Sequence, residues 1–336
     1  MNRYLYCNDF PLNFANGGKE NQLKFVKEVA NSVFDFVGDL NQVENISLNG
    51  NDIIHFFGDT PSFYYLIKFL KGSNHSFKTI ISPNFYRRNY YSYKFLKFIP
   101  SFIPNWYSER FKLYNEVDEI IVNSNHEKKY LKLIFGSWIL EKIHVVYNTF
   151  DQPQKNIPDI KRSKSDYYFM ASHLSERKNV FQLLKASDSI YKKNKLKLHI
   201  AGDLRFFEKK NKLKFIDMLK KRPWVIYHGL LSKIKLEDLY DNCLFHILPS
   251  FIESPGISNL EALSRNKKII VGDFPILHEY FKFEAIYTGF SSNDITNSVD
   301  SLIYTNNYIS NFDLSFCSSE TISKKYSIIF KNILDE

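Results

Sequence analysis

The stretch Phe245-His-Ile-Leu-Pro-Ser-Phe-Ile-Glu253-Ser-Pro-Gly256-Ile-Ser-Asn-Leu-Glu261 decides how this chain folds. Its opening, mostly apolar run is typical of a strand that is buried in a parallel sheet. Glu253 then lies on a loop at the carboxyl end of that strand, and a helix over residues 256–265 contains Glu261. Gly256 lets the backbone approach a ligand closely, and the first N–H groups of the helix, from Gly256, Ile257 and Ser258, form an anion site.

Two carboxylates that flank an anion site predict a pocket for a nucleotide sugar. One Glu would hold ribose hydroxyls and the other sugar hydroxyls, with the diphosphate between them. The spacing of eight residues alone also fits a solvated Glu followed by a Glu on a helix face. The surrounding sequence favours the first interpretation.

Short apolar runs alternate with helical patterns on both sides of this stretch. The first half predicts strands at 3–7, 52–57, 79–82, 119–122 and 143–147, with helices over 19–36 and from a cap at Ser124. The second half predicts strands at 167–171, 196–201, 225–227, 245–248 and 268–271, with helices at 180–192, 236–242 and 256–265. This alternation indicates two α/β domains, each with a parallel sheet covered by helices.

Length and composition agree with two domains. The chain has 336 residues, of which 44% are hydrophobic. We predict a first domain at 1–150, a Pro-containing and basic linker at 151–166, a second domain at 167–317 and a last helix at 318–336. The cysteines, Cys7, Cys243 and Cys317, match no metal or redox spacing, which favours a reducing compartment.

The segment from Glu253 to Glu261 resembles the E-x7-E signature of the retaining glycosyltransferases of family 4, including the Glu-x-x-Gly opening and the Leu-Glu-Ala-Leu close. The resemblance implies the GT-B fold, which consists of two Rossmann-like, doubly wound parallel-sheet domains facing a cleft. It also implies that the first domain binds the acceptor, that the second binds the nucleotide sugar, and that the last helix packs back on the first domain.

Residues 172–179, Ser-His-Leu-Ser-Glu-Arg-Lys-Asn, resemble the phosphate-binding segment Gly-Arg-Leu-x-x-x-Lys-Gly of that family. Lys178 matches the lysine that neutralises the donor diphosphate, although a solvated lysine at a helix start is the other interpretation. His173 stands where the family usually has Arg, so its phosphate contact would depend on pH. Arg177 lies close enough in sequence to compensate.

Further positions of the resemblance surround the donor. Gly202 ends a strand where the family has its Gly-Asp turn, and an ordinary turn is the alternative. Leu230 follows a glycine whose neighbouring backbone pairs with the nucleobase in the family. Gly17 and Gly18 resemble the N-terminal Gly-Gly loop, and Ser124 ends a strand at the cleft, where it also suits a helix cap.

We expect Glu253 and Lys178 to be the catalytic residues. Family members transfer with retention on the front face of the sugar, where the leaving phosphate takes the acceptor proton, so no base is required. His55 is a candidate base but also suits a packing role, and we assign none. No Asp-x-Asp pair is present to clamp a metal on the diphosphate, so we expect no metal and no cofactor beside the nucleotide-sugar co-substrate.

Residues 84–114 interleave aromatic and basic side chains, in a chain with net charge +9 and 17% aromatic residues. The pattern fits contact with an anionic membrane or a lipid-linked acceptor, an aromatic helix packed in the core, or stacking on single-stranded nucleic acid. We favour the first and predict no nucleic-acid partner. Neither an N-terminal leader nor a membrane-spanning stretch is apparent, so we expect a cytoplasmic protein that contacts the inner face of the membrane peripherally.

The resemblance therefore implies a hexosyltransferase-type enzyme. It would move a sugar from a nucleotide-diphosphate sugar to a glycan or lipid-linked glycan, in bacterial surface polysaccharide or lipopolysaccharide synthesis. Two alternatives keep the same fold: a nucleotide-sugar-binding protein without turnover, and a different nucleotide-sugar enzyme.

Overall fold

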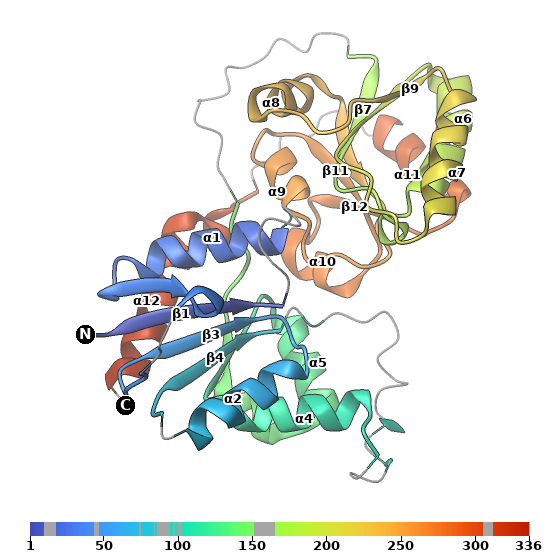
Figure 1. Cartoon of the computed structure of the whole chain (residues 1–336). Helices are drawn as coiled ribbons and strands as arrows, with labels where there is room; N and C mark the ends of the chain where they lie inside the picture. The colour runs from blue at the N-terminus through green and yellow to red at the C-terminus, as the bar shows by residue number, and fades with distance from the viewer. Residues whose placement is uncertain are drawn as a thin grey trace. The chain divides into compact units, whose positions relative to one another are not determined.

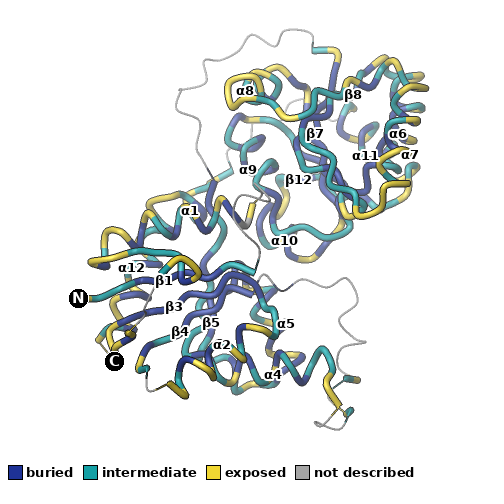
Figure 2. Tube along the Cα trace, in the orientation of Figure 1, coloured by how far each residue is buried: buried dark blue, intermediate teal, exposed yellow. Residues whose placement is uncertain are grey.

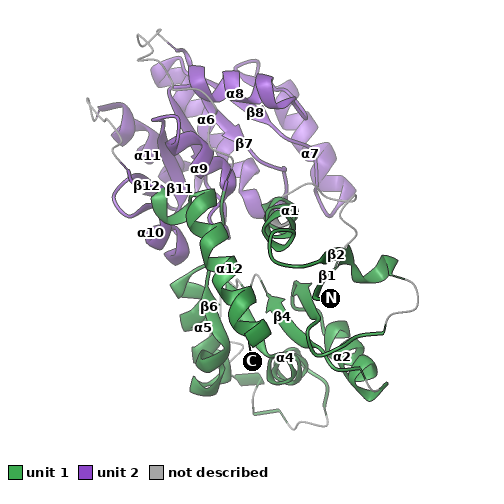
Figure 3. Cartoon of the chain, turned by 90° about the vertical axis from the view of Figure 1, so that its left-hand side faces the viewer, with its two compact units in different colours: residues 1–149, 315–336 green, residues 150–314 purple. Residues whose placement is uncertain are grey.

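The computed structural model describes residues 1–9, 18–43, 47–73, 75–83, 85, 95–96, 98–99, 103–150, 165–304 and 312–335. The chain forms two compact units, one from residues 1–149 with 315–336 and the other from residues 150–314 (Figure 3). Both ends of the chain thus belong to the first unit. Most of the linker predicted at 151–166 lies outside the described residues.

The first unit is built on a six-stranded sheet in the order β2-β1-β3-β4-β5-β6, with every neighbouring pair parallel (Figure 1). Its strands are β1 (Arg3–Asn8), β2 (Phe36–Asp39), β3 (Ile53–Phe57), β4 (Lys78–Ser82), β5 (Glu119–Val122) and β6 (Ile143–Val145). β3 is buried along its whole length, as is typical of a parallel sheet with helices on both faces (Figure 2).

Successive side chains of the central strands enter different cores. Tyr4 of β1 packs in a cluster with α1 (Gly18–Ala30) and the last helix, α12 (Ser319–Asp335). Leu5 enters a second cluster with α2 (Ser62–Gly72), α4 (Trp106–Glu116) and α5 (Asn125–Phe135). Short 3₁₀ turns complete this unit: η2 (Leu40–Gln42), η3 (Ser137–Lys142) and η5 (Ser315–Cys317).

The helix predicted over residues 19–36 is wrong at its C-terminal end. α1 stops at Ala30, and Phe36 already begins the edge strand β2. The Ser32 hydroxyl donates to the carbonyl of Val29 at 2.7 Å, which helps to close the turn. Phe34 lies beyond the helix yet is buried against Tyr4, with 5.4 Å between ring centroids, so the apolar pattern continues where the helix does not.

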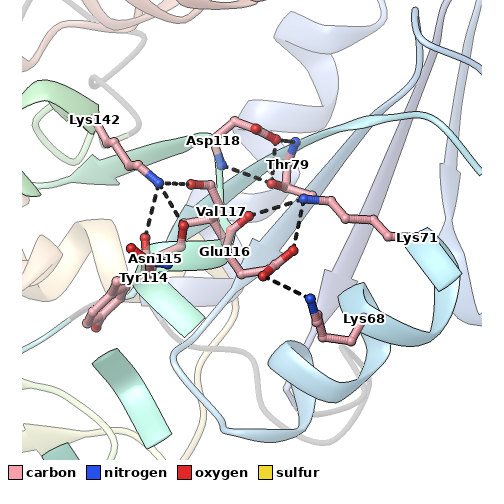
Figure 4. Close-up of polar contacts among 9 residues, drawn as sticks. All are labelled: Lys68, Lys71, Thr79, Tyr114, Asn115, Glu116, Val117, Asp118 and Lys142. Atoms are coloured by element: carbon pink, nitrogen blue, oxygen red, sulfur yellow. Dashed lines mark hydrogen bonds and ion pairs between the residues drawn. The ribbon is translucent and has the colours of Figure 1, made fainter. Parts of the chain in front are cut away.

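A lysine caps the C-terminus of α4 (Figure 4). The Lys142 ammonium donates to the carbonyls of Asn115 at 2.9 Å and Val117 at 2.6 Å, and more weakly to that of Tyr114 at 3.5 Å. Burial lowers the pKa of Lys142. A cation suits this end of the helix, because the final carbonyls have no partner within the helix and carry partial negative charge.

The second unit is built on a six-stranded sheet in the order β12-β11-β10-β7-β8-β9, again parallel throughout. Its strands are β7 (Tyr167–Ala171), β8 (Lys197–Ala201), β9 (Val225–Tyr227), β10 (Phe245–Leu248), β11 (Lys268–Gly272) and β12 (Ala285–Thr288). The predicted α/β class, with two doubly wound parallel sheets, is confirmed.

Helices cover this second sheet. They are α6 (Val180–Asn194), α7 (Lys209–Lys220), α8 (Lys233–Asn242), α9 (Ile257–Leu263), α10 (Pro275–Phe281) and α11 (Ser292–Tyr304), with the 3₁₀ turn η4 (Glu176–Lys178). α6 and α11 share a buried cluster with β7, β8 and β10. α9 lies against β10 and β11, so the motif that contains both glutamates sits at the carboxyl end of two central strands.

Candidate functional site

The structure joins the two residues predicted to be catalytic. The Lys178 ammonium donates a hydrogen bond to a carboxylate oxygen of Glu253, and both side chains are only 13% exposed. Lys178 ends η4 after β7, and Glu253 lies in the loop between β10 and α9. The N–H of Phe251 also donates to the carbonyl of Arg177 at 2.9 Å, which ties the two loops together.

Further contacts keep the Glu253 carboxylate ionised. The Ser250 hydroxyl donates to it at 3.2 Å and the N–H of Ser254 at 3.3 Å. Burial pushes the pKa of Glu253 upward, but the charges of Lys178 and Arg177 outweigh it, so the pKa is lower than usual. An anionic Glu253 and a cationic Lys178 are thus held at one edge of the sheet, where doubly wound folds bind their ligands.

Gly256 stands immediately before α9 in a backbone conformation that favours glycine, with φ 80°. A Cβ added there would lie 2.9 Å from Nδ2 of Asn259 and 3.0 Å from Cγ of Glu253. The glycine therefore allows the loop to bring Glu253 against the helix start. Ile257 and Ser258 are the first two residues of α9, which begins one residue later and ends two residues earlier than the predicted helix 256–265, and both are half-buried.

Glu261 lies on α9, as the sequence predicted, and contacts a tyrosine. The hydroxyl of Tyr240, a residue that is 1% exposed, donates to the Glu261 carboxylate at 2.9 Å. Tyr240 comes from α8, so this bond also orients α9 against its neighbour. The prediction that Glu261 binds donor hydroxyls remains a prediction, with Tyr240 as the group that would position it.

His173 and Gly202 meet at the next loop. His173 Nδ1 pairs with the carboxylate of Asp203, whose other oxygen accepts from Arg205 Nε at 2.8 Å. Burial raises the pKa of Asp203, but Arg205 and His173 overcome this and the pKa is lowered. A Cβ on Gly202 would lie 1.9 Å from the carbonyl oxygen of Ser172, so the close packing of the two loops accounts for this glycine.

The other predicted positions in this unit are exposed. Arg177 is exposed beside Lys178, and Leu230 is 71% exposed after β9. Gly229, which precedes Leu230, has φ 66°, and its carbonyl accepts from the N–H of Gly202 at 2.8 Å. Backbone from three neighbouring loops thus converges on one edge of the second sheet.

The candidates from the first half of the sequence belong to the first unit. Gly18 is the exposed first residue of α1, whereas Gly17 lies outside the described residues. Ser124 is fully buried, and its hydroxyl accepts from the N–H of Glu127 at 2.9 Å. Glu127 in turn accepts from the N–H of Asn123 at 2.9 Å. Ser124 therefore acts as the helix cap that its sequence position allowed.

Sequence reasoning missed His246, a buried polar residue beneath the site. The ring nitrogen Nε2 accepts from the N–H of Ala171 at 3.3 Å, and burial lowers the pKa of His246 to about 3. A neutral imidazole thus links the central strands β10 and β7 where the Lys178 and Glu253 loops begin. The signal in the sequence was a histidine in an otherwise apolar strand.

Within the described ranges, no group of three or more His, Cys, Asp or Glu is arranged to hold a metal ion. The same parts of the chain contain no helix that is long and apolar enough to cross a membrane.

Comparison with known proteins gives matches that include the region of Lys178 and Glu253. Residues 151–306 match the family described as glycosyl transferases group 1. The chain is 23% identical over 182 residues to the O-antigen chain mannosyltransferase RfbU of Salmonella typhimurium, which is 52% of this chain and 50% of that protein. The match thus spans about half the length of that curated relative.

Solved structures resemble the chain over its whole length. A glycosyltransferase from Rickettsia africae superposes with a TM-score of 0.72 at 14% identity, covering 100% of this chain and 99% of that one. HepE of Anabaena, solved in complex with UDP-glucose, superposes with a TM-score of 0.57 at 15% identity, covering 98% of this chain and 94% of that one. Likeness at these identities shows the fold, which is GT-B.

The motif at Glu253, its partner Lys178 and the second sheet all lie within the matched residues 151–306. Residues 151–306 of this chain thus match the glycosyl transferases group 1 family, and the whole chain has a two-domain GT-B fold.

Proposed function

We propose that the protein is a retaining glycosyltransferase that moves a sugar from a nucleotide-diphosphate sugar to a glycan or lipid-linked glycan. The observation behind this proposal is the Lys178–Glu253 pair beside the glycine that precedes α9, within a glycosyl transferases group 1 domain. The named relative is an O-antigen chain mannosyltransferase, and we propose for this protein a role in the synthesis of a bacterial surface polysaccharide.

The charges of the pair suit the two ends of a nucleotide-sugar donor. Lys178 would neutralise the charge that develops on the leaving diphosphate, with exposed Arg177 beside it. Glu253 would accept hydrogen bonds from sugar hydroxyls, while its own ionisation is kept by Lys178. In this scheme Lys178 and Arg177 neutralise the leaving diphosphate in place of a metal ion, and the diphosphate takes the proton of the acceptor hydroxyl.

A donor panel tests the proposal. The full chain is mixed separately with GDP-mannose, UDP-glucose and other nucleotide sugars, and donor hydrolysis and the shift in melting temperature are measured. We expect one donor to stabilise the protein and to be hydrolysed slowly in the presence of excess EDTA. Loss of all activity with EDTA, restored by Mn²⁺, would contradict the assignment of the diphosphate charge to Lys178.

Retention is tested on the product. The anomeric proton of the transferred sugar reports its configuration by NMR, and we expect it to match that of the donor. An inverted product would contradict the retaining mechanism. A donor that binds and is never turned over, with any acceptor, would favour the alternative of a nucleotide-sugar-binding protein.

We further propose that residues 84–114 contact an anionic membrane on the cytoplasmic side. The exposed fraction is 70% for Phe95, 73% for Phe98 and 45% for Ile103, whereas Trp106 and Tyr114 pack into the core of the first unit. The basic positions that the sequence singled out, Arg87, Arg88, Lys94 and Lys97, lie outside the described residues.

Liposome sedimentation tests this contact. We expect the protein to pellet with anionic vesicles, less with neutral ones, and less as salt is raised. Replacing Phe95 and Phe98 by Ser should weaken pelleting, whereas Ser at exposed Phe207 of the second unit is the matched control. Equal pelleting with both kinds of vesicle, or with neither, would refute the contact.

A further inference from the structure

The first unit contains a small cavity at the carboxyl edge of its sheet. Apolar side chains from the ends of β3, β5 and β6 form its walls, and its polar lining comes from Gln22, Ser82, Asn123, Asn148 and Tyr326. The volume open to the centre of a water molecule is about 20 Å³, which suits a single hydroxyl-sized group. None of the residues that line it is charged.

A buried chain of hydrogen bonds leads to this cavity. The Tyr4 hydroxyl lies 2.6 Å from Nδ1 of His55, and Nε2 of His55 lies 2.9 Å from the Ser82 hydroxyl. Tyr4 and His55 are fully buried, and Ser82 is 9% exposed where β4 ends. The three residues come from the adjacent strands β1, β3 and β4, so the sheet itself holds the chain in place.

The donor of each hydrogen bond between Tyr4, His55 and Ser82 can be assigned by starting from Tyr4. Burial raises the pKa of Tyr4 and lowers that of His55 to about 3, so both are neutral. A buried phenol needs an acceptor for its hydrogen, and His55 Nδ1 lies at hydrogen-bond distance. If Tyr4 donates to Nδ1, then His55 carries its proton on Nε2 and donates to the Ser82 oxygen. The Ser82 hydrogen is then not used toward His55, and Ser82 lines the cavity, where that hydrogen can be donated.

We propose that this cavity is a subsite for one hydroxyl group of a neutral acceptor sugar, whose oxygen accepts a hydrogen bond from Ser82. His55 and Tyr4 act as positioning residues, because they set which way the Ser82 hydroxyl points. The inference deepens the proposed glycosyltransferase function and rests on it for the acceptor role. The uncharged lining favours a neutral hydroxyl over a phosphate or a carboxylate, since neither anion would find a cation there.

Binding of simple sugars tests the subsite without any nucleotide. The probes are the methyl α-glycosides of mannose, glucose and galactose and their monodeoxy analogues, measured on the full chain by saturation-transfer NMR. For one sugar, we expect removal of one hydroxyl to weaken binding to the wild type about tenfold, the effect of losing one buried hydrogen bond. Ser82→Ala should weaken the parent sugar by the same factor and leave that deoxy analogue unchanged.

The positioning role has its own readout. In the wild type, ¹⁵N NMR should show His55 protonated on Nε2. In Tyr4→Phe the hydrogen bond that keeps Nδ1 unprotonated is gone, so the Nδ1–H share of His55 should rise above its wild-type level and the parent sugar should bind more weakly. The matched controls are Tyr65→Phe, on the exposed face of α2, and Ser32→Ala, whose hydroxyl bonds locally to Val29. Neither control should alter the His55 signals or sugar binding.

Several results would overturn the subsite. They are no binding of any probe to the wild type, unchanged binding to Ser82→Ala, and equal weakening of parent and deoxy sugars by that variant. The donor panel reports on the proposed function separately. Sugar binding that depends on Ser82, without turnover of any donor, would support the subsite and reject the transferase function. Donor turnover together with sugar binding that does not depend on Ser82 would support the transferase function and reject the subsite.

Discussion

Replacing Glu253 by Gln would leave the Lys178 ammonium in place without its carboxylate. Both side chains are 13% exposed, so the pair is largely removed from water. Removing one partner of a fully buried pair costs about 3–5 kcal/mol. Because some exposure remains here, while the charge of Arg177 adds repulsion to Lys178, we expect a loss of about 2–3 kcal/mol.

A double-mutant cycle separates this stability term from function. The variants are Glu253→Gln, Lys178→Met and the two combined, and unfolding is followed by hydrogen exchange of second-unit peptides as urea is raised. We expect a coupling energy of about 1–3 kcal/mol, so the double variant should regain most of the stability. Donor affinity should fall about tenfold or more in each variant and should not recover in the double variant.

An exposed pair on the same unit provides the control. Lys193 and Asp300 approach to 2.8 Å, with the lysine 50% exposed, and we expect no resolvable coupling between them and no effect on donor binding. The reasoning is refuted if the costs at Lys178 and Glu253 simply add, or if the double variant binds donor as the wild type does.

The pH dependence of this pair has a definite sign. The folded pKa of Glu253 is below its usual value, so the folded state binds the proton less tightly than the unfolded state. The stabilisation is therefore complete above about pH 4.3 and is lost as the pH falls through the folded pKa.

Three further changes have expected outcomes. His246, with a folded pKa of about 3, should contribute a loss of about 2 kcal/mol in unfolding free energy between pH 7 and pH 5, because only the unfolded chain gains the proton. His246→Gln should remove that share of the acid sensitivity, and an unchanged acid slope would contradict the assignment. Gly256→Ala should cost about 1–3 kcal/mol because of its positive φ, whereas Gly72→Ala, where an added Cβ meets nothing within 4 Å, should be neutral or stabilising. Lys142→Met should cost about 1–2 kcal/mol and speed hydrogen exchange in the last turn of α4; unchanged exchange there would show that the cap is not needed.

The sequence revealed the partly exposed edge strands β6 and β9, and above all the strands that are buried by helices on both faces. Such strands must be apolar at nearly every position, as in β10 (Phe245–Leu248), and the pattern is readable without any partner. The edge strands β2 and β12 were missed because they are recognisable only through pairing with β1 and β11, and their residues are partly exposed. Local chemistry likewise located the Ser124 cap and the glycine before α9, since both depend on residues close in the chain.

By itself the sequence determined the α/β class, the two parallel sheets and the position of the glutamate motif after a central strand, because period, turn residues and caps are local properties. Only the tertiary structure decided which groups share charge and hydrogen bonds. Lys178 and Glu253 are 75 residues apart, and Tyr4, His55 and Ser82 come from three strands that meet only in the sheet. Contacts of that kind depend on strand order and packing, which cannot be read from any short stretch of the sequence.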